Sequence, residues 1–201
     1  MPEPFEIIAA PFTAWYAPLG EDFPEINAAV AGNWVKIGAN GDESMNEDGV
    51  TIQHSQEVNK IRPLGSTVPI KAFRTAEDLL ISFTLWDVTE EAYRLAVNSN
   101  AVTTVAAGSG TPGKKTLQFY QGEQVATMAL LLRAEVSPYG DGMNMQYEVP
   151  YCFMSGNPEP VFAKGEPAGL AFEFTALRDP DAGSKAASFG RLVTQHQLPL
   201  A

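Results

Sequence analysis

Residues 108–116, Gly-Ser-Gly-Thr-Pro-Gly-Lys-Lys-Thr, have a spacing close to that of a phosphate-binding loop. The stretch satisfies G-x-G-x-x-G and misses G-x-x-x-x-G-K-[ST] at one position, because Lys115 stands where a hydroxyl should bind Mg²⁺. A phosphate-binding loop also leads into a helix whose first amides hold the phosphate. Residues 116–120 alternate like a strand instead. We therefore predict a loop between strands here, and no nucleotide site.

A second stretch resembles a calcium-binding loop in its alternation of oxygen-bearing side chains. Asp42 begins it, and Ser44, Asn46 and Asp48 follow at every second position. An EF-hand needs glycine at its sixth position and a bidentate glutamate at its twelfth. Glu47 and Gln53 occupy these positions, and no helical pattern flanks them. A solvated acidic loop is the better interpretation.

Residues for acid–base or nucleophilic catalysis are sparse. The only histidines are His54 and His196, and the only cysteine, Cys152, lies between aromatic residues in a strand pattern. Glu90 and Glu91 are adjacent carboxylates, but neighbouring positions of a helix point in different directions. A carboxylate pair assembled across strands stays open, because 24 acidic residues allow many pairs. We predict no catalytic residue, no metal ligand and no cofactor.

Composition narrows the functional classes. The chain has 201 residues, is 45% hydrophobic, and carries 13 basic against 24 acidic residues, a formal charge of −11. This balance disfavours a protein that grips nucleic acid by its phosphates or docks on an anionic membrane. A single cysteine, an acidic and proline-containing start, and an apolar run of only residues 128–132 predict a soluble intracellular protein without a disulfide within the chain or a membrane span.

The elements that must position these residues are mostly strands. We predict a mainly β fold, an antiparallel β-sandwich or barrel with one flanking α-helix near residues 88–97. The helix should begin at Asp87 as its cap, with Glu90 as the capping-box partner. Pro150 interrupts a long strand pattern and predicts a bulge or a sheet edge. The expected strands are 34–37, 50–58, 69–74, 77–86, 116–120, 125–135, 143–153 and 170–175.

We predict extended arms at both ends, over residues 1–31 and 179–201, around a domain of residues 32–178. The first arm places large aromatic residues among prolines, so it cannot form a core of its own and must lie on its own domain or on a neighbour. The following residues are predicted inter-subunit contacts: Phe5, Phe12, Trp15, Tyr16, Phe189 and Leu192.

Several segments of the first half share a resemblance to one family. They are Ala17-Pro18-Leu19-Gly20, Phe23-Pro24, Gly32-Asn33-Trp34, Ile37-Gly38, Glu47-Asp48-Gly49-Val50-Thr51-Ile52, Gly65 with Pro69, Arg74-Thr75-Ala76-Glu77-Asp78 and Ile81-Ser82-Phe83-Thr84-Leu85-Trp86-Asp87-Val88-Thr89-Glu90. Together they resemble the opening of the major tail tube proteins of long-tailed bacteriophages. The likeness covers about residues 12–98, whereas over 115–176 only the strand pattern fits.

The resemblance implies a structural virion protein whose β-sandwich or barrel subunits self-assemble. Six subunits would close a ring, and stacked rings would form a hollow, net-acidic conduit for DNA ejection, as in gene-transfer-agent tails. The implied partners are copies of the chain itself and other tail proteins such as the tape measure, terminator and distal tail proteins. DNA would pass through without tight binding. The implied location is the tail of the virion, after assembly in the host cytoplasm.

An acidic wall would suit such a conduit. DNA carries about one negative charge per 1.7 Å of its axis, so a basic wall would hold it, whereas a net negative wall lets it slide. Polar and acidic strand faces are the candidates to face this lumen, namely Gln53, Glu57, Gln146 and Glu148. Ordinary solvent-facing strand positions would have the same pattern.

Two alternatives remain beside the tube subunit. A tail terminator or connector subunit would form a single ring. A β-sandwich module that binds carbohydrate would need an exposed stacking platform from Trp15, Trp34 or Trp86. An enzyme ranks behind both, because no residue pair is singled out for chemistry.

Overall fold

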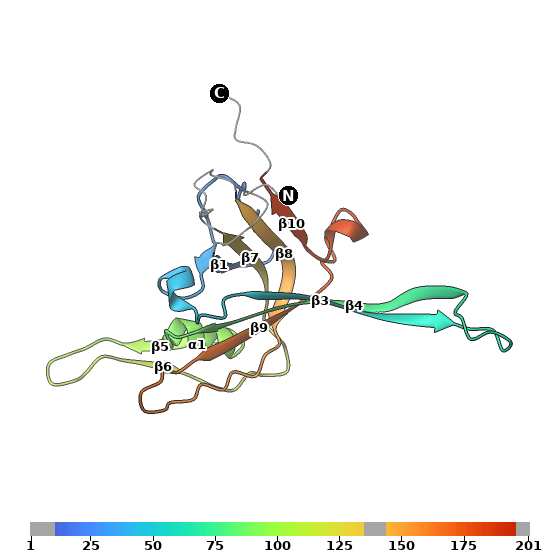
Figure 1. The fold of residues 1–201 in the computed structure, drawn as a ribbon. Helices are drawn as coiled ribbons and strands as arrows, with labels where there is room; N and C mark the ends of the chain where they lie inside the picture. The colour runs from blue at the N-terminus through green and yellow to red at the C-terminus, as the bar shows by residue number, and fades with distance from the viewer. Residues whose placement is uncertain (1–10, 135–143, 196–201) are drawn as a thin grey trace, which may run out of the picture.

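The computed structural model describes residues 11–134 and 144–195, which form a mainly antiparallel β structure with one α-helix (Figure 1). This confirms the predicted fold class. The strands are β1 (Phe12–Ala17), β2 (Val35–Lys36), β3 (Thr51–Ile61), β4 (Lys71–Leu85), β5 (Val102–Val105), β6 (Lys114–Leu117), β7 (Thr127–Ala134), β8 (Met145–Met154), β9 (Leu170–Ala176) and β10 (Arg191–Thr194). The helix α1 spans Glu90–Ala96, and short 3₁₀ turns cover Gly41–Ser44 and Lys185–Ala187.

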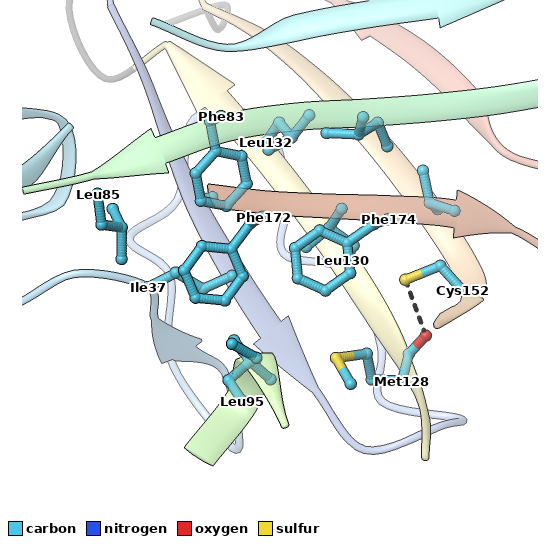
Figure 2. Close-up of a cluster of buried hydrophobic side chains, with 14 of the residues drawn as sticks. Ile37, Phe83, Leu85, Leu95, Met128, Leu130, Leu132, Cys152, Phe172 and Phe174 are labelled. Carbon is cyan, nitrogen blue, oxygen red and sulfur yellow. Dashed lines mark hydrogen bonds between the residues drawn. The ribbon is translucent and has the colours of Figure 1, made fainter. Parts of the chain in front are cut away.

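One large sheet builds the body in the order β2-β1-β7-β8-β9-β4-β3, and β10 adds to β8. β5 and β6 form a separate two-stranded sheet. The large sheet bends over itself, so that β4 and β9 cross the layer that contains β1 and β7, with α1 at one end (Figures 1 and 2). The result is sandwich-like packing of two layers from one continuous sheet.

The main core lies between these two layers. Alternate residues of β4 and β9 point inward, among them Phe83, Phe172 and Phe174, and the rings of Phe83 and Phe172 stack with centroids 5.4 Å apart. Leu130 and Leu132 of β7 face them from the other layer (Figure 2). The strict alternation of apolar and polar residues in β4 and β9 is what places these rings on one face.

A second, smaller core covers the opposite face of β7, where Ala129 and Leu131 pack with Trp15 and Trp34. Seven consecutive residues of β7 are buried because both faces of the strand are covered. The segment between β1 and β2 supplies this cover, and the indole N–H of Trp34 donates to the carbonyl of Asp22 at 3.0 Å.

The boundaries predicted for the arms are corrected by this packing. All six residues of β1 pair with β7, so residues 12–17 belong to the sheet and not to an arm. At the other end, β10 pairs with residues 145–148 of β8, so part of the segment 179–201 is also in the sheet. The local sequence pattern does not reveal that these short segments pair with β7 and β8, since both partners lie far away along the chain.

Two local predictions have different outcomes. The bulge at Pro150 is confirmed, because Met128 pairs with Cys152 and Leu130 with Val149, which leaves one extra residue on β8. The predicted cap of the helix is wrong. Thr89, not Asp87, accepts the amide of Ala92, whereas the carboxylate of Asp87 accepts the backbone N–H of Ala39 at 2.7 Å.

Candidate assembly surface

A two-stranded ribbon projects from the body where β3 and β4 continue beyond the sheet (Figure 1). The pairing register shifts between Glu57 and Val58, so Thr75 is an extra residue on β4, and its hydroxyl donates to the carbonyl of Glu57 at 3.3 Å. Such a bulge increases the local twist and redirects the strands. We refer to residues 58–74, beyond this bulge, as the finger. At about 3.3 Å per residue, its strands reach roughly 13 Å past the bulge.

No residue of the finger is buried against the body. Every residue from 53 to 78 is exposed to solvent. Several large apolar side chains are nevertheless on it, with Leu64 fully exposed and Ile70 exposed by 72%. The others are Val58, Ile61, Val68 and Phe73. Six large exposed apolar side chains within one short ribbon are typical of an interaction site.

Both faces of the finger combine apolar and basic side chains. The register places Ile61 opposite Lys71 and Asn59 opposite Phe73 on one face. On the other face, Val58 lies opposite Arg74 and Lys60 opposite Ala72. A partner of either face must therefore offer apolar surface together with acceptors for cations.

Both edges of the finger lack a strand partner within the described chain. β3 pairs with β4 alone, and β4 pairs with β9 only from Leu80 to Leu85. Free strand edges present unpaired amides and carbonyls, which another chain can complete. A two-stranded ribbon without further cover is also marginally stable in water. Its geometry therefore favours a partner.

A second projection leaves the body in another direction, formed by the β5–β6 hairpin (Figure 1). Asn98 anchors the chain that returns from it: its side-chain nitrogen donates to the carbonyls of Gln121 and Gln124 at 2.6 and 2.9 Å. Its side-chain oxygen accepts the backbone N–H of Ala126 at 2.5 Å. The returning segment also exposes Tyr120 by 83%.

The predicted inter-subunit residues are placed mostly within the subunit. Trp15 is buried in the smaller core of its own subunit, so its prediction as an inter-subunit contact is wrong. Phe12, Tyr16 and Phe189 are partly buried against the main core. Leu192 on β10 is exposed, and Phe5 lies outside the described residues.

The predicted lumen residues divide into two groups. Gln53 and Glu57 are exposed on β3, so they remain available to face a channel. Gln146 and Glu148 are exposed by only 1% and 3%, so their assignment to a lumen is wrong. The segment between β1 and β2 covers their face of β8, and the carbonyl of Pro24 accepts from the Gln146 side chain at 3.0 Å.

The residues considered above for phosphate binding or catalysis have structural roles in this fold. Residues 108–113 form the turn of the β5–β6 hairpin and lead into a strand, as predicted. Glu90 pairs with Lys115, whereas Glu91 pairs with Arg94. Burial raises the pKa of Cys152 to about 12. Over residues 11–134 and 144–195, no group of three or more His, Cys, Asp or Glu side chains could hold a metal ion.

The tryptophans bear on the carbohydrate-binding alternative. Trp15 and Trp34 are buried, and only Trp86 is substantially exposed, by 44%. A stacking platform of tryptophans is therefore limited to one side chain.

Comparison with known proteins adds no relative: no protein-family model matches the chain, and no curated protein matches it. Within the described residues, no helix has the length and apolar character needed to cross a membrane.

Sequence reasoning missed the finger as a unit. Residues 50–58 and 69–74 were expected as separate strands, although the turn residues Pro63, Gly65 and Pro69 between them are a hairpin signal. A second signal is electrostatic, since residues 58–74 include four basic and no acidic residues.

Proposed function

We propose that this chain is a structural subunit that assembles with its own copies into rings, stacked as a hollow tube like the tail tubes of long-tailed phages. The observation that carries the proposal is the finger, a ribbon with open edges and exposed apolar side chains, none of whose residues is buried in its own subunit. Within an assembly, the same groups would be covered by neighbouring copies.

The resemblance of residues 12–98 to tail tube proteins supports the tube over other assemblies. The strand that precedes the finger also offers Gln53 and Glu57 as exposed polar groups for a channel wall. A net charge of −11 makes tight retention of DNA on such a wall unfavourable. DNA would therefore pass through the tube without strong binding.

The test compares the full chain with a variant in which an Asn-Gly turn replaces residues 58–75, so that it joins the paired residues Glu57 and Ala76. Asn-Gly closes a two-residue hairpin, and the removed segment contributes no buried residue, so the body should keep its fold. We expect the full chain to form large species in light scattering and hollow rods in negative-stain micrographs. The shortened variant should stay monomeric with an unchanged circular dichroism spectrum.

Other outcomes separate the alternatives. Single rings that do not stack would indicate a terminator or connector subunit. A full chain that stays monomeric at high concentration would contradict assembly, and binding of that monomer to a glycan array would favour the carbohydrate-binding module.

A further inference from the structure

Charge is segregated between the finger and the rest of the chain. The finger includes Lys60, Arg62, Lys71 and Arg74 and no acidic residue. The remaining residues include nine basic and 24 acidic ones, a formal charge of −15. The finger is therefore a cationic projection on a strongly anionic protein, and a second copy of the chain offers it a surface of opposite charge.

One groove of the body matches the finger in chemistry. It lies between the loop that follows β1, the bulge of β8 and the turn that follows β9, with a volume of about 320 Å³. Four carboxylates line it, from Glu21, Asp22, Asp179 and Asp181, together with apolar residues that include Leu19, Phe23, Pro150 and Tyr151. No lysine or arginine is among its lining residues in the described chain.

Two of these carboxylates are available for a partner. The side chain of Glu21 binds the backbone and side-chain N–H groups of Asn33, which lower its pKa and keep it ionised. Asp22 and Asp181 are exposed, and their carboxylates have no described partner within residues 11–134 and 144–195. Two anions that line the groove thus have no counter-ion within the part of the chain that the structure describes.

We propose that the finger of one copy docks in this groove of a second copy, with its cations on the carboxylates of Asp22 and Asp181 and its apolar side chains against the apolar lining residues. This inference rests on the proposed function, since it assigns the receiving surface for assembly. The finger does not fill the groove of its own copy, because all of its residues are exposed and none of them lines that groove. Finger and groove are different surfaces, so the contact is head-to-tail and either closes into a ring or propagates.

The test reverses charges on each side. A finger variant carries Lys60→Glu and Arg62→Glu, and a groove variant carries Asp22→Lys and Asp181→Lys; all four side chains are exposed. Like charges brought together at an interface cost several kcal/mol, so each variant alone should associate about 100-fold more weakly than the wild type in sedimentation experiments. Mixing the two variants should restore association, because every finger then finds a groove of opposite charge.

A control variant, Glu43→Lys with Glu47→Lys, changes the charge by the same amount at exposed positions outside the groove and should assemble like the wild type. Failure of the mixture to associate while the wild type assembles would overturn the groove but leave the proposed function intact. A wild type that never assembles would overturn both.

The cationic finger could instead contact nucleic acid, and the same variants decide this. Anisotropy of a labelled 24-base-pair duplex should show no binding that depends on Lys60 and Arg62. Loss of duplex binding in the finger variant with unchanged self-association would overturn the docking proposal.

Discussion

Arg133 and Gln146 face each other across the β7–β8 pair, and the Nε of Arg133 donates to the side-chain oxygen of Gln146 at 2.8 Å with both residues buried. Gln146 in turn donates to the carboxylate of Glu148 at 2.5 Å, and Arg191 of β10 pairs with the other oxygen of that carboxylate. One hydrogen-bond network thus connects the segment between β1 and β2, the centre of the large sheet and β10.

The first prediction concerns Arg133, which also donates to the carbonyls of Ala28 and Glu25 at 2.5 and 2.9 Å. Arg133→Met removes the arginine donors from Gln146 and from both carbonyls, and the carbonyl of Glu25 keeps only the backbone N–H of Ala28. Removing one member of a buried charged network costs about 3–5 kcal/mol. We expect a loss of about 3 kcal/mol in the free energy of unfolding, measured by urea denaturation.

The measurement needs the variant in which Asn-Gly replaces residues 58–75, so that assembly does not add to the apparent stability. Arg94→Met is the matched control, because Arg94 is on the outer side of α1 in an exposed ion pair with Glu91. It should change stability by less than about 0.5 kcal/mol. Equal losses in the free energy of unfolding for the two substitutions would contradict a stabilising role of the buried network.

The same network explains what the sequence could and could not predict. Alternation along β4 and β9 correctly predicted their inward faces, because one face of each strand lies on the main core. The same rule placed Gln146 and Glu148 outward, since both are polar. Their face is covered by a segment more than 100 residues earlier in the chain, and that contact leaves no local pattern.

The finger could not be predicted from the sequence because nothing in the fold covers it, whereas the face of Gln146 and Glu148 is covered by a distant segment. Its strands have ordinary turn residues and β-branched residues, which predict a hairpin but do not reveal whether a body lies beneath it. Exposure of residues 53–78 is a property of the whole fold, because it depends on β9 pairing with β4 only from Leu80 onward. The one feature of the sequence that distinguishes the finger is its charge, four basic and no acidic residues.

The second prediction concerns Asn98, which ends α1 with a positive φ of 63° and anchors the segment returning from the β5–β6 hairpin. Asn98→Gly tolerates this backbone angle but loses the side-chain bonds, whereas Asn98→Ala loses the bonds and strains the backbone. We expect a loss of about 1 kcal/mol for glycine and about 2 kcal/mol for alanine in urea unfolding. Equal losses would mean that the left-handed backbone contributes no strain.

The third prediction concerns Cys152, whose Sγ contacts the carbonyl of Met128 at 3.4 Å inside the main core (Figure 2). Burial raises its pKa from the ordinary value of 9.0 to about 12, so the folded protein keeps the neutral thiol. A thiol reagent at pH 8 should therefore modify the chain only in denaturant.

The sign of the pH effect follows from the same pKa shift. Between pH 9 and 12 the unfolded chain has lost the Cys152 proton and the folded chain retains it, so stability is complete below pH 9 and decreases above it. The expected slope from this residue is about 1.4 kcal/mol per pH unit. The difference in slope between the wild type and Cys152→Ala isolates it, and parallel slopes would contradict the assignment.

The fourth prediction concerns the apolar tip of the finger. Leu64→Ser with Val68→Ser should leave the free energy of unfolding unchanged within about 0.5 kcal/mol, because both side chains are exposed in the single subunit. Burial of one such side chain at an interface is worth about 1.5–3 kcal/mol, so the pair should weaken self-association by at least 100-fold. Sedimentation velocity over a range of protein concentrations measures this.

Val105→Ser, on the β5–β6 hairpin, is a control with another exposed apolar residue that lies outside the finger. Self-association that depends on Val105 but not on Leu64 and Val68 would move the assembly surface to that hairpin.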